Sequence, residues 1–126
     1  MNDYRYISLQ DLEAYKLSRK YSREGLGIYK NMDWQTKKIL GDQMITSVDS
    51  IGANIAEGYG RYHYLDKNKF YYNARASLFE SEHWFDLLNE RMIITKEKRL
   101  ECSYLSQHIL ACTNGLIRSQ YTQKQK

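Results

Sequence analysis

The stretch YYNARASLFESEHWFDLLNERM, from Tyr71 to Met92, decides the fold class. Apolar or small residues recur in it at intervals of three and then four, which places them along one side of an α-helix. A strand would instead alternate apolar and polar residues at every second position. The pattern predicts a helix from about Asp66 to Met92, with a core-facing seam of Tyr71, Ala74, Leu78, Ser81, Phe85, Leu88 and Met92.

Three further segments have the same helical period, from Ser8 to Met32, from Asp33 to about Gly60, and from Thr95 to Ser119. Asp33 is a good N-cap residue ahead of Trp34. The seam of the second segment is Gly41, Met44, Val48, Ile51, Ile55 and Gly58, and that of the last is Cys102, Leu105, Ile109, Cys112 and Leu116. In the first segment two stripes compete: Leu12, Tyr15, Leu26 and Tyr29 on one, and Ala14, Leu17, Tyr21 and Ile28 on the other.

The links between the four segments are short, at residues 31–33, 62–65 and 93–95. Short links force successive helices to run antiparallel. The chain also has no proline, the residue that most strongly breaks or kinks a helix, so long helices can run uninterrupted. We therefore expect an all-α, antiparallel up-down-up-down four-helix bundle: a single domain over residues 1–120 and a frayed basic tail over residues 121–126.

Lysine and arginine number 19 against 15 acidic residues, a net charge of +4 that permits contact with nucleic acid without requiring it. Cys102 and Cys112 are too far apart along a rigid helix to form a disulfide, so we expect reduced core cysteines. No apolar run reaches the roughly 20 residues of a membrane span, and the polar start lacks the apolar region of a signal peptide. These features predict a cytoplasmic protein.

Apolar residues also lie beside the seams. Phe70 and Trp84 form a second stripe on the helix after Asp66. A helix that is apolar over more than its core-facing arc must bury the surplus elsewhere, so we expect a homo-oligomer.

The stretch IGANIAEGYGRY, from Ile51 to Tyr62, combines two patterns. Asn54, Glu57 and Arg61 share a helix face, with Glu57 and Arg61 in the favourable order for an ion pair. Gly52, Ala53, Ala56 and Gly60 form a small-residue face that allows a close helix crossing, and Gly58 and Gly60 can end the helix. Two interpretations stay open: the polar residues fix register across a helix interface, or Glu57 lies at a subunit junction with Arg61 facing a channel.

The segment NIAEGYGR, from Asn54 to Arg61, carries a resemblance to a known family. It is preceded by Gln43 and Ser50 and followed by KFYYNARASLFESE, from Lys69 to Glu82. Together with LEAY at 12–15 and IYK at 28–30, this resembles the 23S rRNA intervening-sequence proteins of bacteria, a family that includes the accessory variability determinant of diversity-generating retroelements. The resemblance covers residues 9–117, and its motif and packing positions are Asn54, Ile55, Ala56, Glu57, Gly58 and Gly60.

The resemblance implies a homopentamer of four-helix bundles arranged around a central channel, without enzymatic activity. It also implies either RNA or DNA binding or a partnership with a reverse transcriptase. This chain departs from the family at residues 43–47, where QMITS lacks the usual arginine pair after the glutamine. That loss weakens the expectation of phosphate contacts and favours the alternative, a protein-protein scaffold.

The region after the motif holds the candidate nucleic-acid contacts. Basic side chains can hold phosphates while tyrosines stack on unpaired bases. The candidates are Arg61, Tyr62, Tyr64, Lys67, Lys69 and Arg75. Under the alternative interpretation, Tyr59, Tyr71 and Tyr72 pack in the core or at a subunit contact.

Neither metal nor nucleophilic chemistry is predicted. Glu80 and His83 form one Glu-x-x-His unit, whereas a di-iron bundle needs two, so we expect Glu80 and Glu82 to make helix or subunit contacts. The two cysteines lie on an apolar seam, where a thiol is unreactive. We expect no catalytic residue, no metal and no cofactor.

Overall fold

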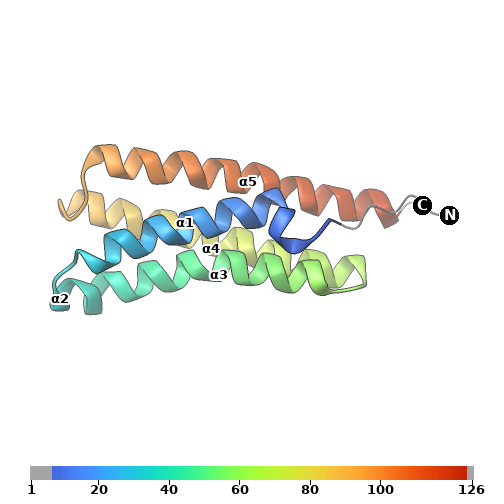
Figure 1. Cartoon of the computed structure of the whole chain (residues 1–126), viewed down its shortest axis with the longest axis horizontal. Coiled ribbons are helices and arrows are strands. Elements are labelled where there is room, and N and C mark those ends of the chain that lie inside the picture. The colour runs from blue at the N-terminus through green and yellow to red at the C-terminus, as the bar shows by residue number, and fades with distance from the viewer. Residues whose placement is uncertain (1–6, 125–126) are drawn as a thin grey trace.

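The computed structural model describes residues 7–124, which form four long antiparallel helices (Figure 1). They are α1 (Glu13–Lys30), α3 (Asp42–Gly60), α4 (Tyr64–Glu90) and α5 (Lys96–Lys124). Helix α1 packs on α3 and α5, and α4 packs on the same two helices, so α1 and α4 face each other across the diagonal of the bundle. The predicted all-α four-helix bundle is confirmed.

The start of the first helix and the end of the last helix differ from the prediction. Near the start of the described residues there is a short 3-10 turn, η1 (Leu9–Asp11), and Leu12 is extended, so α1 begins at Glu13 and not at Ser8. At the other end α5 continues past Ser119 to Lys124, so residues 121–124 of the expected frayed tail are helical. Residues 125 and 126 of that tail lie outside the described residues.

The second helical segment begins as predicted and then changes its winding. The Asp33 carboxylate accepts a hydrogen bond from the Thr36 amide at 2.7 Å, which caps α2 (Trp34–Thr36). A π-helical turn, η2 (Lys37–Gly41), follows before α3. A Cβ at Gly41 would lie 2.7 Å from the Met32 sulfur. The Tyr29 ring would lie 3.0 Å from the same Cβ, so a larger residue at Gly41 requires the Met32 and Tyr29 side chains to move.

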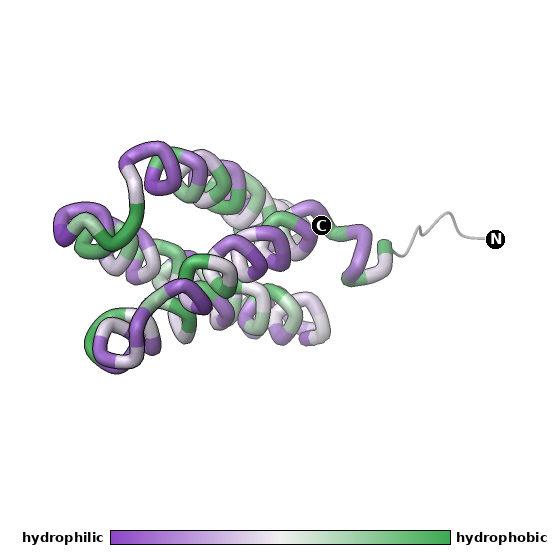
Figure 2. The backbone as a smooth tube through the Cα atoms, turned by 60° about the vertical axis from the view of Figure 1, so that its left-hand side comes forward, coloured by the Kyte–Doolittle hydropathy of each residue, from purple (hydrophilic) through white to green (hydrophobic). Residues whose placement is uncertain are grey.

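The core consists of the predicted seams (Figure 2). Met44, Val48, Ile51 and Ile55 of α3 are fully buried. In α1 the stripe through Tyr21 faces the core, whereas Leu26 on the competing stripe is 43% exposed. No helix within residues 7–124 is both long enough and apolar enough to cross a membrane.

Met92 is the seam residue for which the prediction is wrong. It lies after the end of α4, is 88% exposed and has a positive φ of 59°. The Ile93 and Met92 amides donate to the carbonyls of Leu88 and Asn89, the hydrogen-bond pattern of a Schellman motif. The residue in Met92's position of that motif is usually glycine, because a side chain there is strained.

We predict that Met92→Gly raises the free energy of unfolding by about 0.5–1 kcal/mol. Relief of left-handed strain contributes about 1–2 kcal/mol, and the extra backbone entropy of glycine in the unfolded chain offsets about 0.5–1 kcal/mol of it. Urea denaturation measures the change. Met92→Ala is the matched control, because it shortens the side chain but keeps the Cβ, and it should bring no gain. Equal stability of the two variants would contradict the strain.

Candidate nucleic-acid interface

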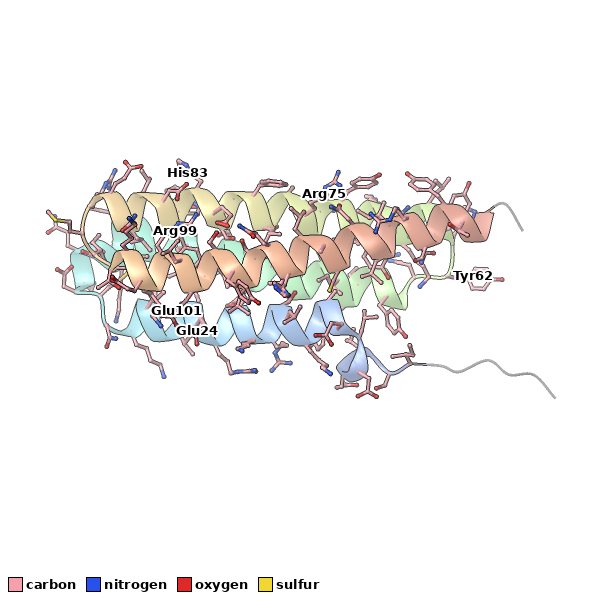
Figure 3. The ribbon with its side chains drawn as sticks, turned by 90° about the horizontal axis from the view of Figure 1, so that it is seen from above. Glu24, Tyr62, Arg75, His83, Arg99 and Glu101 are labelled. Atoms are coloured by element: carbon pink, nitrogen blue, oxygen red, sulfur yellow. The ribbon has the colours of Figure 1, made fainter. Side chains whose placement is uncertain are left out.

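The region predicted to contact nucleic acid lies at the α3–α4 turn. Arg61 ends α3, and His63 caps α4 by accepting a hydrogen bond from the Leu65 amide at 3.2 Å. Between them Tyr62 is 98% exposed and points away from the end of the bundle (Figure 3). Tyr64 stacks on the His63 ring with the centroids 4.8 Å apart. The turn thus presents one fully free aromatic side chain.

The cations of this region are largely engaged within the chain. Arg61 pairs with Glu57 at 2.7 Å and lies over the Phe70 ring. The Lys67 ammonium donates to the Tyr59 carbonyl at 2.8 Å, at the end of α3, and burial lowers its pKa. Arg75 donates to Asn114 of α5 at 2.8 Å. Of the four predicted cations, Lys69 is exposed and makes only a loose contact with the Phe70 ring, at 5.8 Å.

The tyrosines near this region divide between core and surface. Tyr71 is 1% exposed, and burial raises its pKa to about 12, so the packing interpretation is confirmed for it. Tyr72 is 38% exposed, and a hydrogen bond with Tyr121 raises its pKa. The Tyr59 hydroxyl donates to the Ile7 carbonyl, which ties the start of the described chain to α3.

The polar residues of the family-like motif act within their own helix. The Asn54 amide donates to the Ser50 carbonyl one turn earlier at 2.9 Å, so it does not fix register across a helix interface as one interpretation expected. Glu57 and Arg61 form the predicted pair on the outside of α3, where their side chains are 50% and 45% exposed. Exposed pairs of this kind contribute only a few tenths of a kcal/mol.

The small residues of the motif serve two different contacts. A Cβ on Gly52 would lie 3.5 Å from Ser18 of α1, an ordinary van der Waals contact, so α1 passes this position without requiring glycine. The tighter contact is on the α4 side, where a Cβ on Gly58 would lie 2.8 Å from the Tyr71 ring. Ala53 and Ala56 line an open hollow of about 260 Å³ beside α1, and Gly60 faces open space. Glycine is therefore required at Gly58 rather than along the whole face.

A second basic surface, which the sequence reasoning missed, runs along α1. We call it the α1 basic face; its five exposed cations are Lys16, Arg19, Lys20, Arg23 and Lys30. Its first and last members span about 21 Å at 1.5 Å per residue. Lys16 is 3.7 Å from Glu13, a loose ion pair, while Arg19 donates to the Tyr15 hydroxyl at 2.9 Å and lies over its ring. The sequence could have indicated this surface, because cations three and four residues apart on a predicted helix share one face.

Of the two α4 glutamates, Glu82 makes the predicted contact between helices, whereas Glu80 bonds within its own helix. Glu82 accepts hydrogen bonds from Arg99, at 2.7 Å, and from Ser106, both on α5. Glu80 accepts from the Trp84 indole at 3.0 Å. His83 points outward from α4 (Figure 3). Within residues 7–124 no three histidine, cysteine or acidic side chains are grouped as metal ligands would be.

The cysteines are poor nucleophiles. Cys102 is fully buried, and burial raises its pKa from 9.0 to about 11. Burial also raises the pKa of the half-buried Cys112. At neutral pH both thiols therefore stay protonated, whereas a nucleophilic cysteine needs the thiolate.

We predict that alkaline pH destabilises the fold through Cys102. The folded-state pKa exceeds the unfolded-state value, so the unfolded chain ionises first, and stability that is fully present below pH 9 falls as the pH approaches 11. The expected loss is about 1–3 kcal/mol. Urea titrations at a series of pH values measure it. Cys102→Ala should show a shallower decline, because it keeps the tyrosine contributions and removes the thiol; an unchanged slope would contradict the assignment.

Comparison with known proteins identifies relatives of this chain. The family model described as "23S rRNA-intervening sequence protein" matches residues 10–115. A crystal structure of a protein of unknown function from the S23 ribosomal protein family of Bacteroides thetaiotaomicron VPI-5482 is similar, with a TM-score of 0.77 and 25% sequence identity over 82% of this chain and 97% of that one. No curated protein matches.

Proposed function

Because the chain belongs to the family of 23S rRNA-intervening sequence proteins, we propose that it binds RNA without catalysing a reaction and that the α1 basic face contacts the phosphates. The observation that carries this proposal is the row of five exposed cations on one side of one helix. Neutralising phosphates releases condensed counterions, which supplies most of the affinity in sequence-independent binding.

The geometry of α1 suits a phosphate backbone better than it suits base recognition. A helix presents its cations in a line. Their long, flexible side chains can reach the phosphates of an RNA strand even where that strand is not parallel to the helix axis. Arginine adds planar, bidentate hydrogen bonding to phosphate at Arg19 and Arg23. Tyr62, which is 98% exposed at the α3–α4 turn, is the side chain most available for stacking on an unpaired base.

The α3–α4 turn has a secondary role in this proposal. Arg61 is already paired with Glu57 at 2.7 Å, so contacting a phosphate requires breaking or sharing that ion pair. Lys67 already occupies the carbonyls at the end of α3. Lys69 and Tyr62 remain the contacts that the turn offers.

We predict that Arg19→Gln/Arg23→Gln lowers the salt dependence of binding to single-stranded RNA. Each lost phosphate contact should reduce the slope of log K against log salt by about 0.7, so the double variant should lose about 1.4. Fluorescence anisotropy of a labelled oligonucleotide at several salt concentrations measures the slope. Arg61→Gln/Lys69→Gln is the matched control: it removes the same net charge from the other surface and should reduce the slope less.

Two outcomes would contradict the proposal. Absent or salt-insensitive binding by the wild-type chain would exclude RNA binding through a basic surface. Equal losses in the two double variants would show that total charge, and not the α1 basic face, determines affinity.

We also propose that the chain forms a homo-oligomer, a pentamer as its family resemblance implies. Phe70 and Trp84, which the sequence predicted to be exposed apolar residues on α4, are both covered. Trp84 packs half-buried against the core, and Phe70 lies beneath the side chains of Arg61 and Lys69. Phe79 instead is 58% exposed on the outside of α4. An exposed phenylalanine of this kind favours burial at a subunit contact.

We predict that Phe79→Ser weakens self-association. Sedimentation velocity of the wild-type chain should give a species of five times the 15.0 kDa chain mass, and the variant should shift toward smaller species at the same concentration. Leu100→Ser is the control, because Leu100 is equally exposed, at 59%, but lies on α5. A monomeric wild-type chain would exclude the oligomer, and wild-type sedimentation of Phe79→Ser would exclude Phe79 as a contact.

A further inference from the structure

An elongated groove runs between α1 and α5. Its main hollow has a volume of about 620 Å³ and lies between Leu17, Lys20 and Glu24 of α1 and residues 97–108 of α5. A second hollow of about 260 Å³ shares Glu24 with it, and a third of about 210 Å³ shares Lys98 with the second. The three therefore adjoin one another along one side of the bundle, with the Lys98–Glu24 ion pair between the first and the second, and we call them together the α1–α5 groove.

The walls of the groove are apolar in the middle. Leu105 is 9% exposed, whereas Leu100 and Tyr104, one turn apart on α5, are 59% and 66% exposed. Leu17 of α1 is half-buried opposite them. Leu100 and Tyr104 thus expose apolar surface to water at the edge of a hollow. A ligand of matching shape would bury this surface.

The charges along the groove are not evenly distributed. Glu24 and Glu101 lie across the groove from each other (Figure 3), and Lys98 between them is 3.1 Å from the first and 3.7 Å from the second. Glu97 adds a third carboxylate where the main hollow meets the second, while Lys20 and His108 lie farther along the main hollow. Around this junction three carboxylates face two cations, Lys98 and Arg23, so the main hollow attracts basic side chains.

We propose that the α1–α5 groove binds an amphipathic helix of another protein, one whose apolar stripe is flanked by lysine or arginine. A hollow between two packed helices fits the ridge of a third. The part of α5 that lines the main hollow, residues 97–108, is about 16 Å long at 1.5 Å per residue, or three helical turns. Leucine-like side chains of the partner would cover Leu100 and Tyr104, and its cations would face Glu97 and Glu101.

A second copy of this chain fits the groove poorly. A two-fold contact would bring hollow against hollow, which leaves both unfilled. Arg99 of α5 pairs with Asp86 of α4 at 2.8 Å, so the part of α4 around Asp86 lies at the same height along the bundle as the groove. If two copies packed side by side and parallel, this part of α4 in one copy would approach the groove of the other. Its exposed surface carries Phe79, the subunit contact proposed above, together with Glu80 and Glu90; the two glutamates would meet Glu97 and Glu101 as like charges, which disfavours this arrangement. The proposal is independent of RNA binding.

The test uses a synthetic fluorescein-labelled peptide of leucine, alanine and lysine, four turns long, with leucines at i, i+3, i+4, i+7 and i+11 and lysines beside them. Anisotropy titration with the full chain should show saturable binding. Leu100→Ser/Tyr104→Ser should weaken it by about tenfold or more, because large buried side chains dominate helix-in-groove affinity. Glu97→Lys/Glu101→Lys should weaken it as well, and more so at low salt.

Three controls make the result specific. A peptide of the same composition in scrambled order should bind at least about tenfold more weakly, because its apolar residues no longer share a face. A version with glutamate in place of lysine should also bind more weakly. Ile39→Ser, at a residue 57% exposed on η2, should leave affinity unchanged.

Two results would overturn the proposal. Equal binding of the ordered and scrambled peptides would show that the groove does not recognise a helix. If the ordered peptide fails to bind, and Leu100→Ser/Tyr104→Ser changes the sedimentation of the chain alone, then a second copy covers the groove.

Discussion

The hydrogen bond between Tyr21 and Ser81 is the interaction on which the bundle depends most. It joins α1 to α4 across the diagonal, at 2.9 Å, and both residues are fully buried. Burial raises the pKa of Tyr21, and its ring meets Phe85 edge-on with the centroids 5.6 Å apart. A buried hydroxyl without a partner costs about 1–3 kcal/mol, so a helical shift that separated this pair would be penalised twice, in hydrogen bonding and in ring packing. The register of α1 against the rest of the bundle follows from this contact.

That register determines what α1 presents to solvent. With Ala14, Tyr21 and Ile28 turned inward, the cations three and four residues apart on the opposite side must face outward, and together they form the α1 basic face. The same rotation places Leu17 and Glu24 toward α5, where they line the α1–α5 groove. Two candidate binding surfaces of this protein are thus consequences of one core contact.

Sequence periodicity predicts the seams because burying apolar area dominates the free energy of folding and selects the same face along a whole helix. It fails where one local contact decides. It misses the π turn η2, which ends at Gly41, and it misses the exposed position of Met92, which depends on how the chain leaves α4; neither leaves a periodic signal. For the site, the turn residues were recognised by type, but Arg61 and Lys67 have partners within the chain. Sequence shows that a cation is present and does not show whether it is already paired.

The two proposed surfaces share a border, since Lys20 belongs to the α1 basic face and also lines the α1–α5 groove. A basic helix bound in the groove would add positive charge within a few ångströms of that face. At physiological ionic strength the Debye length is about 8 Å, so this charge would still reach phosphates held on α1. The two ligands would then favour each other's binding, and linkage requires the effect to be reciprocal. The bundle would in this way join a nucleic acid to a protein, with Lys20 at the point where the two surfaces meet.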